Sequence, residues 1–344
     1  MTAERKQTQI EQLSERAWSE VQKLAGRFGG GPERTPIATF GKELGIIRVQ
    51  FAPLWSNAGL RRFGDGFEIV INTESPGVGH KAGQVLEMEP EAFSRLGSPL
   101  RFTTAHEVAH LVFLKVAGDV KQDVFVKNVE AVENACNILA RILLVPAPTL
   151  MKETNARILD VGNVRGLLDA FAVSPEVFIR RMHLSDLRAG FAGTDGLLAL
   201  AERNGPALEV RTCHIFGAGR ALERFERALP GQDGNRRRHT SLSGSYRQAG
   251  WKLEGRPLKE LGIGIDVDSL ISGKKPGAVN LDVPLHPGEK RVIPCELRFV
   301  CLGDEPPTFL VSIRVSGSDV DMGRETFLPI EEAAEYTIKR RADA

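Results

Sequence analysis

The sequence predicts an α+β protein of more than one domain, with helices and strands concentrated in different parts of the chain. Its 344 residues exceed what a single small domain usually holds. Apolar residues recur at helical spacing through much of the first half, whereas the part after about residue 205 contains alternating runs typical of strands. The composition, 42% hydrophobic and 26% charged, is that of an ordinary globular protein and excludes wholesale disorder.

Charge and cysteine content narrow the class of protein further. Lys and Arg total 45 against 44 for Asp and Glu, so the formal net charge of +1 gives no field that would draw the whole molecule onto nucleic acid or anionic lipid. Four cysteines without a CxxC pair are too few for a disulfide scaffold. Because neither a signal-peptide pattern nor a membrane-length apolar run is present, the sequence predicts a cytoplasmic protein without a membrane partner.

The N-terminal region predicts one long helix followed by short strands. Eight apolar side chains recur at helical spacing before a Gly-Gly-Gly-Pro stop, namely Ile10, Leu13, Ala17, Trp18, Val21, Leu24, Ala25 and Phe28. A short helix is expected over residues 37–44, then strands over 46–51 and 67–71. Residues 74–99 are rich in Gly, Pro and Ser, which predicts a long surface loop.

Two strong helices are predicted next, over residues 102–116 and 129–145. The second is apolar on most faces and is therefore expected to be buried, with Pro146 and Pro148 ending it. A smaller helical region is expected to continue to about residue 204. Beyond it, alternation predicts strands over 207–216, 291–301 and 308–315.

Within the smaller helical region, residues 164–184 predict two short helices joined at residues 172–174. Ser174 is a good N-cap and Pro175 a good first residue for the second helix. The segment resembles half of a helix-turn-helix, with Arg180 and Arg181 available for a phosphate. An ordinary helical hairpin is the favoured interpretation, because two arginines make a small footprint for nucleic acid.

Residues 106–110 read His-Glu-Val-Ala-His, an HExxH motif on a predicted helix. Residues four apart share one helix face, so both imidazoles can reach a single metal ion. Glu107, next to the first histidine, can polarise a water molecule without entering the coordination sphere. Two imidazoles, one carboxylate and an open position suit zinc, and manganese is the alternative because ligand type alone does not fix the metal.

A site with two histidines needs a third protein ligand, and four acidic residues compete for the role. Glu130 and Glu133 lie at the start of the apolar helix, where Glu130 is better explained as a partner of the helix dipole. Glu133 lies four residues before Asn137, so this amide could support the carboxylate or the neighbouring chain through a hydrogen bond. Asp119 and Asp123 are competing ligands from a predicted loop.

Two blocks of this sequence resemble the ImmA/IrrE metallopeptidases, a family of gluzincin-like zinc enzymes. Residues 101–110, RFTTAHEVAH, are similar to the family's RFTxAHExxH segment, and residues 133–146 are similar to its E-x-x-A-N-x-F-A-x-x-L-L-x-P helix. Residues 67–72, FEIVIN, fit the strand ending in Asn that usually precedes them. The resemblance covers roughly residues 35–150. Ala, Phe and Met are usual in the family at the positions of Cys136, Leu139 and Val145.

The resemblance implies a zincin-like core and a zinc-dependent endopeptidase that cuts a transcriptional repressor, relieving repression of stress-response or mobile-element genes. Carried over residue by residue, His106, His110 and Glu133 bind the metal, and Glu107 is the general base. A small helical module after the peptidase part is also typical of the family. The oxyanion-stabilising residue is not identified: the candidates are His80, His183 and Arg101, and the alternative is that no residue has this role.

Four regions are therefore expected. Residues 1–34 form an amphipathic helix packing on the core, 35–150 the peptidase core, 151–204 a helix-turn-helix-like module, and 205–344 a C-terminal α+β domain of unassigned role. The competing interpretation is a non-catalytic metal-binding regulatory protein that binds a repressor or DNA through the helical module. Neither the identity of the protein substrate nor the oligomeric state follows from the sequence.

Overall fold

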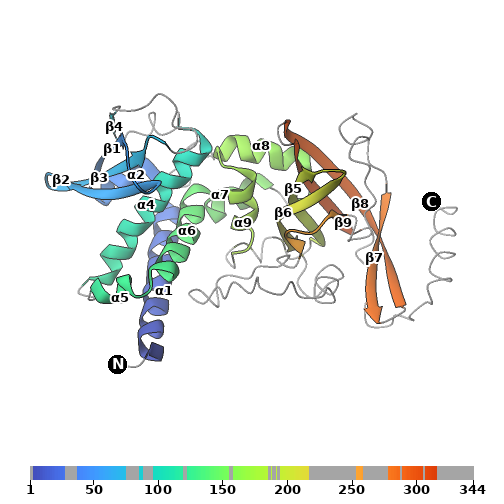
Figure 1. Ribbon diagram of the computed structural model, residues 1–344, viewed down its shortest axis with the longest axis horizontal. Coiled ribbons are helices and arrows are strands. Elements are labelled where there is room, and N and C mark those ends of the chain that lie inside the picture. Colours follow the sequence, from blue (N-terminus) through green and yellow to red (C-terminus); the bar gives the residue numbers. More distant parts are fainter. Residues whose placement is uncertain are drawn as a thin grey trace. The chain divides into compact units, whose positions relative to one another are not determined.

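The computed structural model combines helices with two β-sheets, so the predicted α+β class is confirmed (Figure 1). The chain divides into two compact units, one of residues 1–154, 166–186 and 237–247 and the other of the remaining segments. The zincin core, the helix-turn-helix module and the region boundaries stay predictions. The structure describes residues 3–27, 37–74, 85–87, 96–118, 122–154, 158–184, 187, 191, 194–216, 253–258, 278–286, 289–304 and 307–315.

Three long helices form the helical layer of the first unit. Helices α1 (Ala3–Arg27), α4 (Ser98–Ala117) and α6 (Val129–Leu144) contact one another pairwise and lie side by side (Figure 1). The predicted apolar stripe of α1 is confirmed, apart from Phe28, which lies outside the described residues. The stripe residues that are buried are Ile10, Leu13, Ala17, Trp18, Val21, Leu24 and Ala25.

Proline and glycine residues mark the ends of α4, which carries the HExxH motif, and of α6, which carries Glu130 and Glu133. Pro99 stands in the first turn of α4, where its missing N–H costs no hydrogen bond, and Gly118 follows the last residue with a φ of +52°. The expected burial of α6 is confirmed, because nine of its sixteen residues are buried. Pro146 ends it, and the chain resumes as helix α7 (Ala147–Thr154).

A four-stranded sheet with strand order β2-β3-β1-β4 completes the first unit. The predicted helix and strands near residues 37–71 are confirmed as α2 (Ile37–Glu43), β1 (Ile46–Ala52) and β3 (Gly66–Asn72). Two strands were not predicted, namely β2 (Ala58–Phe63) and β4 (Val85–Glu87). Both are edge strands, and β2 carries no alternation of apolar and polar residues, so nothing in its sequence marked it. β4 lies inside the predicted loop.

The first unit also contains the second half of α8 (Val161–Phe171) and α9 (Pro175–Arg181). The predicted joint is confirmed, since Ser174 Oγ accepts a hydrogen bond from Val177 N at 3.3 Å. Arg181 is completely buried, and its Nε donates to Val145 O at the end of α6, at 2.8 Å. The expectation that Arg181 is available for a phosphate is therefore wrong, because its guanidinium is committed to the end of α6.

The second unit contains an antiparallel five-stranded sheet with strand order β6-β5-β9-β8-β7. The three strands predicted after residue 205 are confirmed as β6 (Ala207–Phe216), β8 (Glu289–Asp304) and β9 (Pro307–Val315), and β7 (Ala278–His286) is added. One face of this sheet is covered by a buried apolar cluster that includes Leu197, Val210, Leu297 and Phe309.

The helical region predicted to reach residue 204 ends earlier, because Gly196–Asn204 forms strand β5. Its sequence, GLLALAERN, is rich in good helix formers. In the sheet, however, β5 pairs with β6 on one side and β9 on the other, so hydrogen bonding and burial on both edges override the local propensity.

Among the described residues, no single helix has both the length and the apolar character needed to cross a membrane. Helices α6 and α7 pass that test only when taken together, and they are bent by 50° where they meet.

Candidate metal centre

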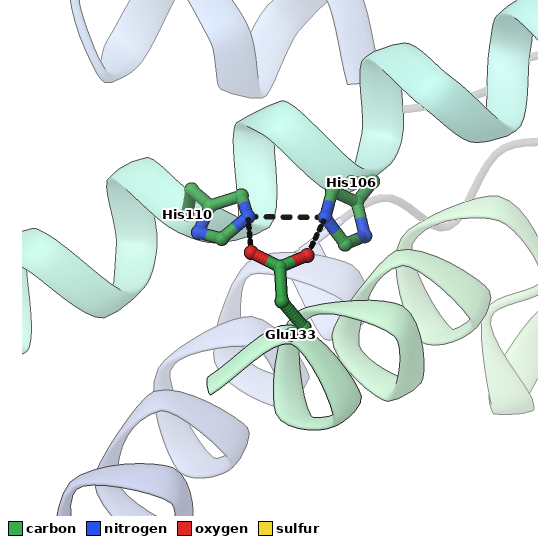
Figure 2. A group of neighbouring side chains, drawn as sticks. All are labelled: His106, His110 and Glu133. Atoms are coloured by element: carbon green, nitrogen blue, oxygen red, sulfur yellow. Dashed lines mark hydrogen bonds and ion pairs between the residues drawn. The ribbon is translucent and has the colours of Figure 1, made fainter. Parts of the chain in front are cut away.

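Three side chains from two helices converge in the first unit. His106 and His110 lie one turn apart on α4, and Glu133 faces them from α6 (Figure 2). Their ligand atoms all lie within 4.8 Å of one another, and within the described ranges no other group of three or more His, Cys, Asp or Glu converges in this way. The helical spacing of the HExxH motif and the packing of α4 against α6 are what bring the three together.

The distances within the cluster suit one shared ion. His106 Nε2 lies 3.0 Å from Glu133 Oε2, His110 Nε2 lies 3.3 Å from Glu133 Oε1, and the two Nε2 atoms are 3.0 Å apart. Ligands at ordinary bond lengths around a tetrahedral zinc ion are separated by about 3.3 Å. Two imidazole nitrogens and one carboxylate are also common ligands of zinc. Both the geometry and the chemistry of the cluster therefore fit a zinc ion.

Asn137 holds the first histidine from behind. Its Oδ1 lies 3.0 Å from His106 Nδ1, one turn of α6 beyond Glu133. A carbonyl oxygen only accepts hydrogen bonds, so Nδ1 carries the proton and the lone pair of Nε2 is directed into the cluster. Of the two expected partners of this amide, the carboxylate and the neighbouring chain, the contact observed is with the neighbouring chain, at the imidazole of α4.

The second histidine has a partner that the sequence analysis missed. Cys136 Sγ lies 3.4 Å from His110 Nδ1, the ring nitrogen that faces away from the cluster. The signal was present in the spacing, because residue 136 lies three positions after Glu133 and so shares its helix face. From the sequence, Cys136 stood out only because Ala is usual at this position in the resembled family.

Burial shifts the titration of two residues of the HExxH motif. Burial, and secondly the neighbouring His106, lower the pKa of His110 below its usual value, which favours the neutral imidazole that a metal needs. Burial, and secondly the charge of Glu133, raise the pKa of Glu107 to about 7. The Glu107 side chain is only 7% exposed. A carboxylate that exchanges a proton near neutral pH is suited to general acid–base work.

The competing residues stand apart from this cluster or outside the described part of the chain. Glu130 is exposed in the first turn of α6 and does not join the group. Asp119 lies outside the described residues, as does the side chain of Asp123. Of the candidates for stabilising an oxyanion, Arg101 and His183 are buried and His80 is not described, so that role stays unassigned.

Comparison with known proteins gives a match in the part of the chain that carries the cluster. Residues 99–183 match the family model described as the IrrE N-terminal-like domain, Peptidase_M78, and this range contains His106, His110 and Glu133. No curated protein matches the chain. A Mycobacterium tuberculosis transcriptional regulator of known structure is 12% identical, with a TM-score of 0.39 over 88% of this chain and 79% of that one, a likeness too weak to support an argument. The match of residues 99–183 to the IrrE N-terminal-like domain supports the resemblance of this part of the chain to the ImmA/IrrE peptidase family.

Proposed function

We propose that the chain is a zinc-dependent endopeptidase that hydrolyses a peptide bond in a protein partner. The observation that carries the proposal is the convergence of His106, His110 and Glu133 beside the buried Glu107. The family resemblance adds the partner's class, a DNA-binding helix-turn-helix repressor whose cleavage relieves repression of stress-response or mobile-element genes. The four free cysteines fit a reducing compartment, so we place the reaction in the cytoplasm.

The proposed ligands have defined tasks. His106 and His110 would each offer Nε2, and Glu133 would offer its carboxylate from the facing helix. Zinc held there would supply a Lewis acid that polarises a peptide carbonyl and makes water a better nucleophile; manganese is the alternative ion. Asn137 keeps the His106 ring in the orientation and tautomer that this requires.

Glu107 is the proposed general base. It would accept the proton of the attacking water and later deliver a proton to the departing amine. Its burial and its raised pKa support this role, because they leave a carboxylate able to hold and release a proton near neutral pH. A purely structural metal site has no need of a buried carboxylate that is not itself a ligand next to a ligand, so Glu107 favours the enzyme.

The rival is a non-catalytic metal-binding regulator that binds a repressor or DNA through the helical module, and its DNA contact has less support. Arg181 is buried against the end of α6, and Arg180 Nε donates to Glu176 at 2.9 Å. Both arginines that suggested phosphate binding therefore have partners within the protein. The remaining discriminator is whether Glu107 is needed for activity.

The test compares the wild-type protein with Glu107→Gln after both are loaded with zinc. Each is incubated with a peptide library derived from whole proteins, and new N-termini are identified by mass spectrometry. We expect cleavage by the wild type and a loss of about 10²-fold or more in the variant. Both proteins should hold one zinc per chain by elemental analysis, because Glu107 is not a ligand. Equal cleavage by the two proteins, or none by the zinc-loaded wild type, would contradict the proposal.

A further inference from the structure

The two histidines of the cluster are held from behind by consecutive residues of α6. Asn137 Oδ1 lies 3.0 Å from His106 Nδ1, and Cys136 Sγ lies 3.4 Å from His110 Nδ1. In both cases the contacted nitrogen is the one that faces away from Glu133. One helix thus supplies the third proposed ligand and a partner for each of the other two.

Cys136 is placed to accept a hydrogen bond from the His110 ring. It is fully buried, with an exposed fraction of 0%, so water does not compete for the ring nitrogen from the sulfur's side. A thiol sulfur at this place can accept a weak hydrogen bond from the ring N–H.

An imidazole that presents Nε2 to a metal must carry its proton on Nδ1. In the metal-bound state the neutral ring carries its one proton on Nδ1. If this N–H is buried without an acceptor, the bound state is destabilised and metal affinity falls. We infer that Cys136 is a positioning residue, whose sulfur accepts the Nδ1–H bond of His110 and so fixes the orientation and tautomer in which His110 binds the metal. This inference rests on the proposed metal site.

The test measures zinc affinity on the full chain by competition with a chromophoric chelator. Cys136→Ala should raise the zinc dissociation constant by roughly 10- to 100-fold, the effect expected when the partner of a metal-binding histidine is removed. Cys136→Ser keeps an acceptor at the same position and should stay within roughly threefold of the wild type. Cys213→Ala is the matched control, because it removes an equally buried thiol from the sheet of the second unit and should leave zinc affinity unchanged.

Thermal unfolding of the metal-free proteins separates positioning from packing. Cys136→Ala and Cys213→Ala each remove one buried sulfur and should lower the melting temperature similarly, while only the former weakens zinc binding. Wild-type affinity in Cys136→Ala would overturn the inference and leave the proposed function standing. Equal losses in Cys136→Ala and Cys136→Ser would overturn it too, since packing would then be the cause. A wild-type chain that binds no zinc would refute the proposed function and the inference together.

Discussion

The sheet and the metal centre of the first unit each bury a glutamate, and their pKa values move in opposite directions. Glu68 on β3 has a fully buried side chain, yet hydrogen bonds and charges of Arg48 and Arg61 outweigh the effect of burial and lower its pKa. The burial of Glu107 on α4 is reinforced by a second carboxylate, Glu133, and its pKa rises to about 7. A buried carboxylate paired with cations stabilises the fold, whereas one placed beside a like charge is ready to move a proton.

Substitution of Glu107, but not of Glu68, should greatly reduce peptide hydrolysis. Glu107→Gln should reduce peptide hydrolysis by about 10²- to 10⁴-fold, because the amide cannot accept a proton. Glu68→Gln, measured at a temperature where it remains folded, should keep activity near the wild-type value. Initial rates on one cleaved peptide, with zinc content checked for each protein, give the comparison. Equal losses in the two variants would mean that Glu107 has no special chemical role.

Substitution of Glu68 should lower the free energy of unfolding more than substitution of Glu107. Glu68→Gln should lower the free energy of unfolding by about 1–3 kcal/mol, because it leaves the cations of Arg48 and Arg61 without their counter-charge. The loss is below that of a fully buried pair, since the Arg61 side chain is 60% exposed and can be solvated. Glu107→Gln should cost little, because an amide avoids the penalty of burying a charge. Urea unfolding of both metal-free variants measures the difference.

Acid should weaken the sheet through Glu68. Its folded-state pKa lies below the value of 4.5 expected in the unfolded chain. The stabilisation is therefore complete above about pH 4.5 and is lost as the pH falls through the lower, folded-state pKa. Urea midpoints measured from pH 6 down to pH 3 should fall less steeply in Glu68→Gln than in the wild type. Parallel slopes would show that Glu68 does not contribute to acid sensitivity.

The two arginines that pair with Glu68 should contribute unequally to stability. Arg48 Nε donates to Glu68 at 2.8 Å, and its guanidinium lies 3.7 Å from the centre of the Phe63 ring. Its side chain is also less exposed than that of Arg61, at 26% against 60%. Arg48→Gln should therefore lower the free energy of unfolding by about 1–2 kcal/mol, and Arg61→Gln by about 1 kcal/mol or less. The reverse order would show that exposure does not govern these pairs.

The parts of the molecule that the sequence predicted correctly are those whose pattern is local. The apolar stripe of α1 repeats over many turns, the cap at Ser174 depends on neighbours three residues away, and the HExxH motif lies on one helix face. Long-range contacts explain the failures. Strand β5 has the composition of a helix and is set by its partners in the sheet, and β2 is an edge strand with no apolar alternation.

In the candidate site, too, the local patterns were predictable and the long-range contacts were not. Resemblance to a family pattern singled out Glu133, and helical spacing marked Asn137, but the atom each would contact depends on how α6 faces α4. The spacing places Cys136 on the helix face of Glu133, but its contact with His110, 26 residues away in the chain, depends on how α6 faces α4. The burial of Arg181 at the end of α6 was hidden for the same reason, since its partner lies 36 residues away.

Zinc content distinguishes Glu133 from Glu130 as the third metal ligand. The wild-type protein and Glu133→Ala are purified in parallel, exposed to equal zinc and analysed for elements, with Glu130→Ala as the control from the same helix. We expect close to one zinc per chain in the wild type and in Glu130→Ala, and a clear loss in Glu133→Ala. A Glu133→Ala protein that keeps its full zinc content would contradict the assignment of His106, His110 and Glu133 as the metal centre.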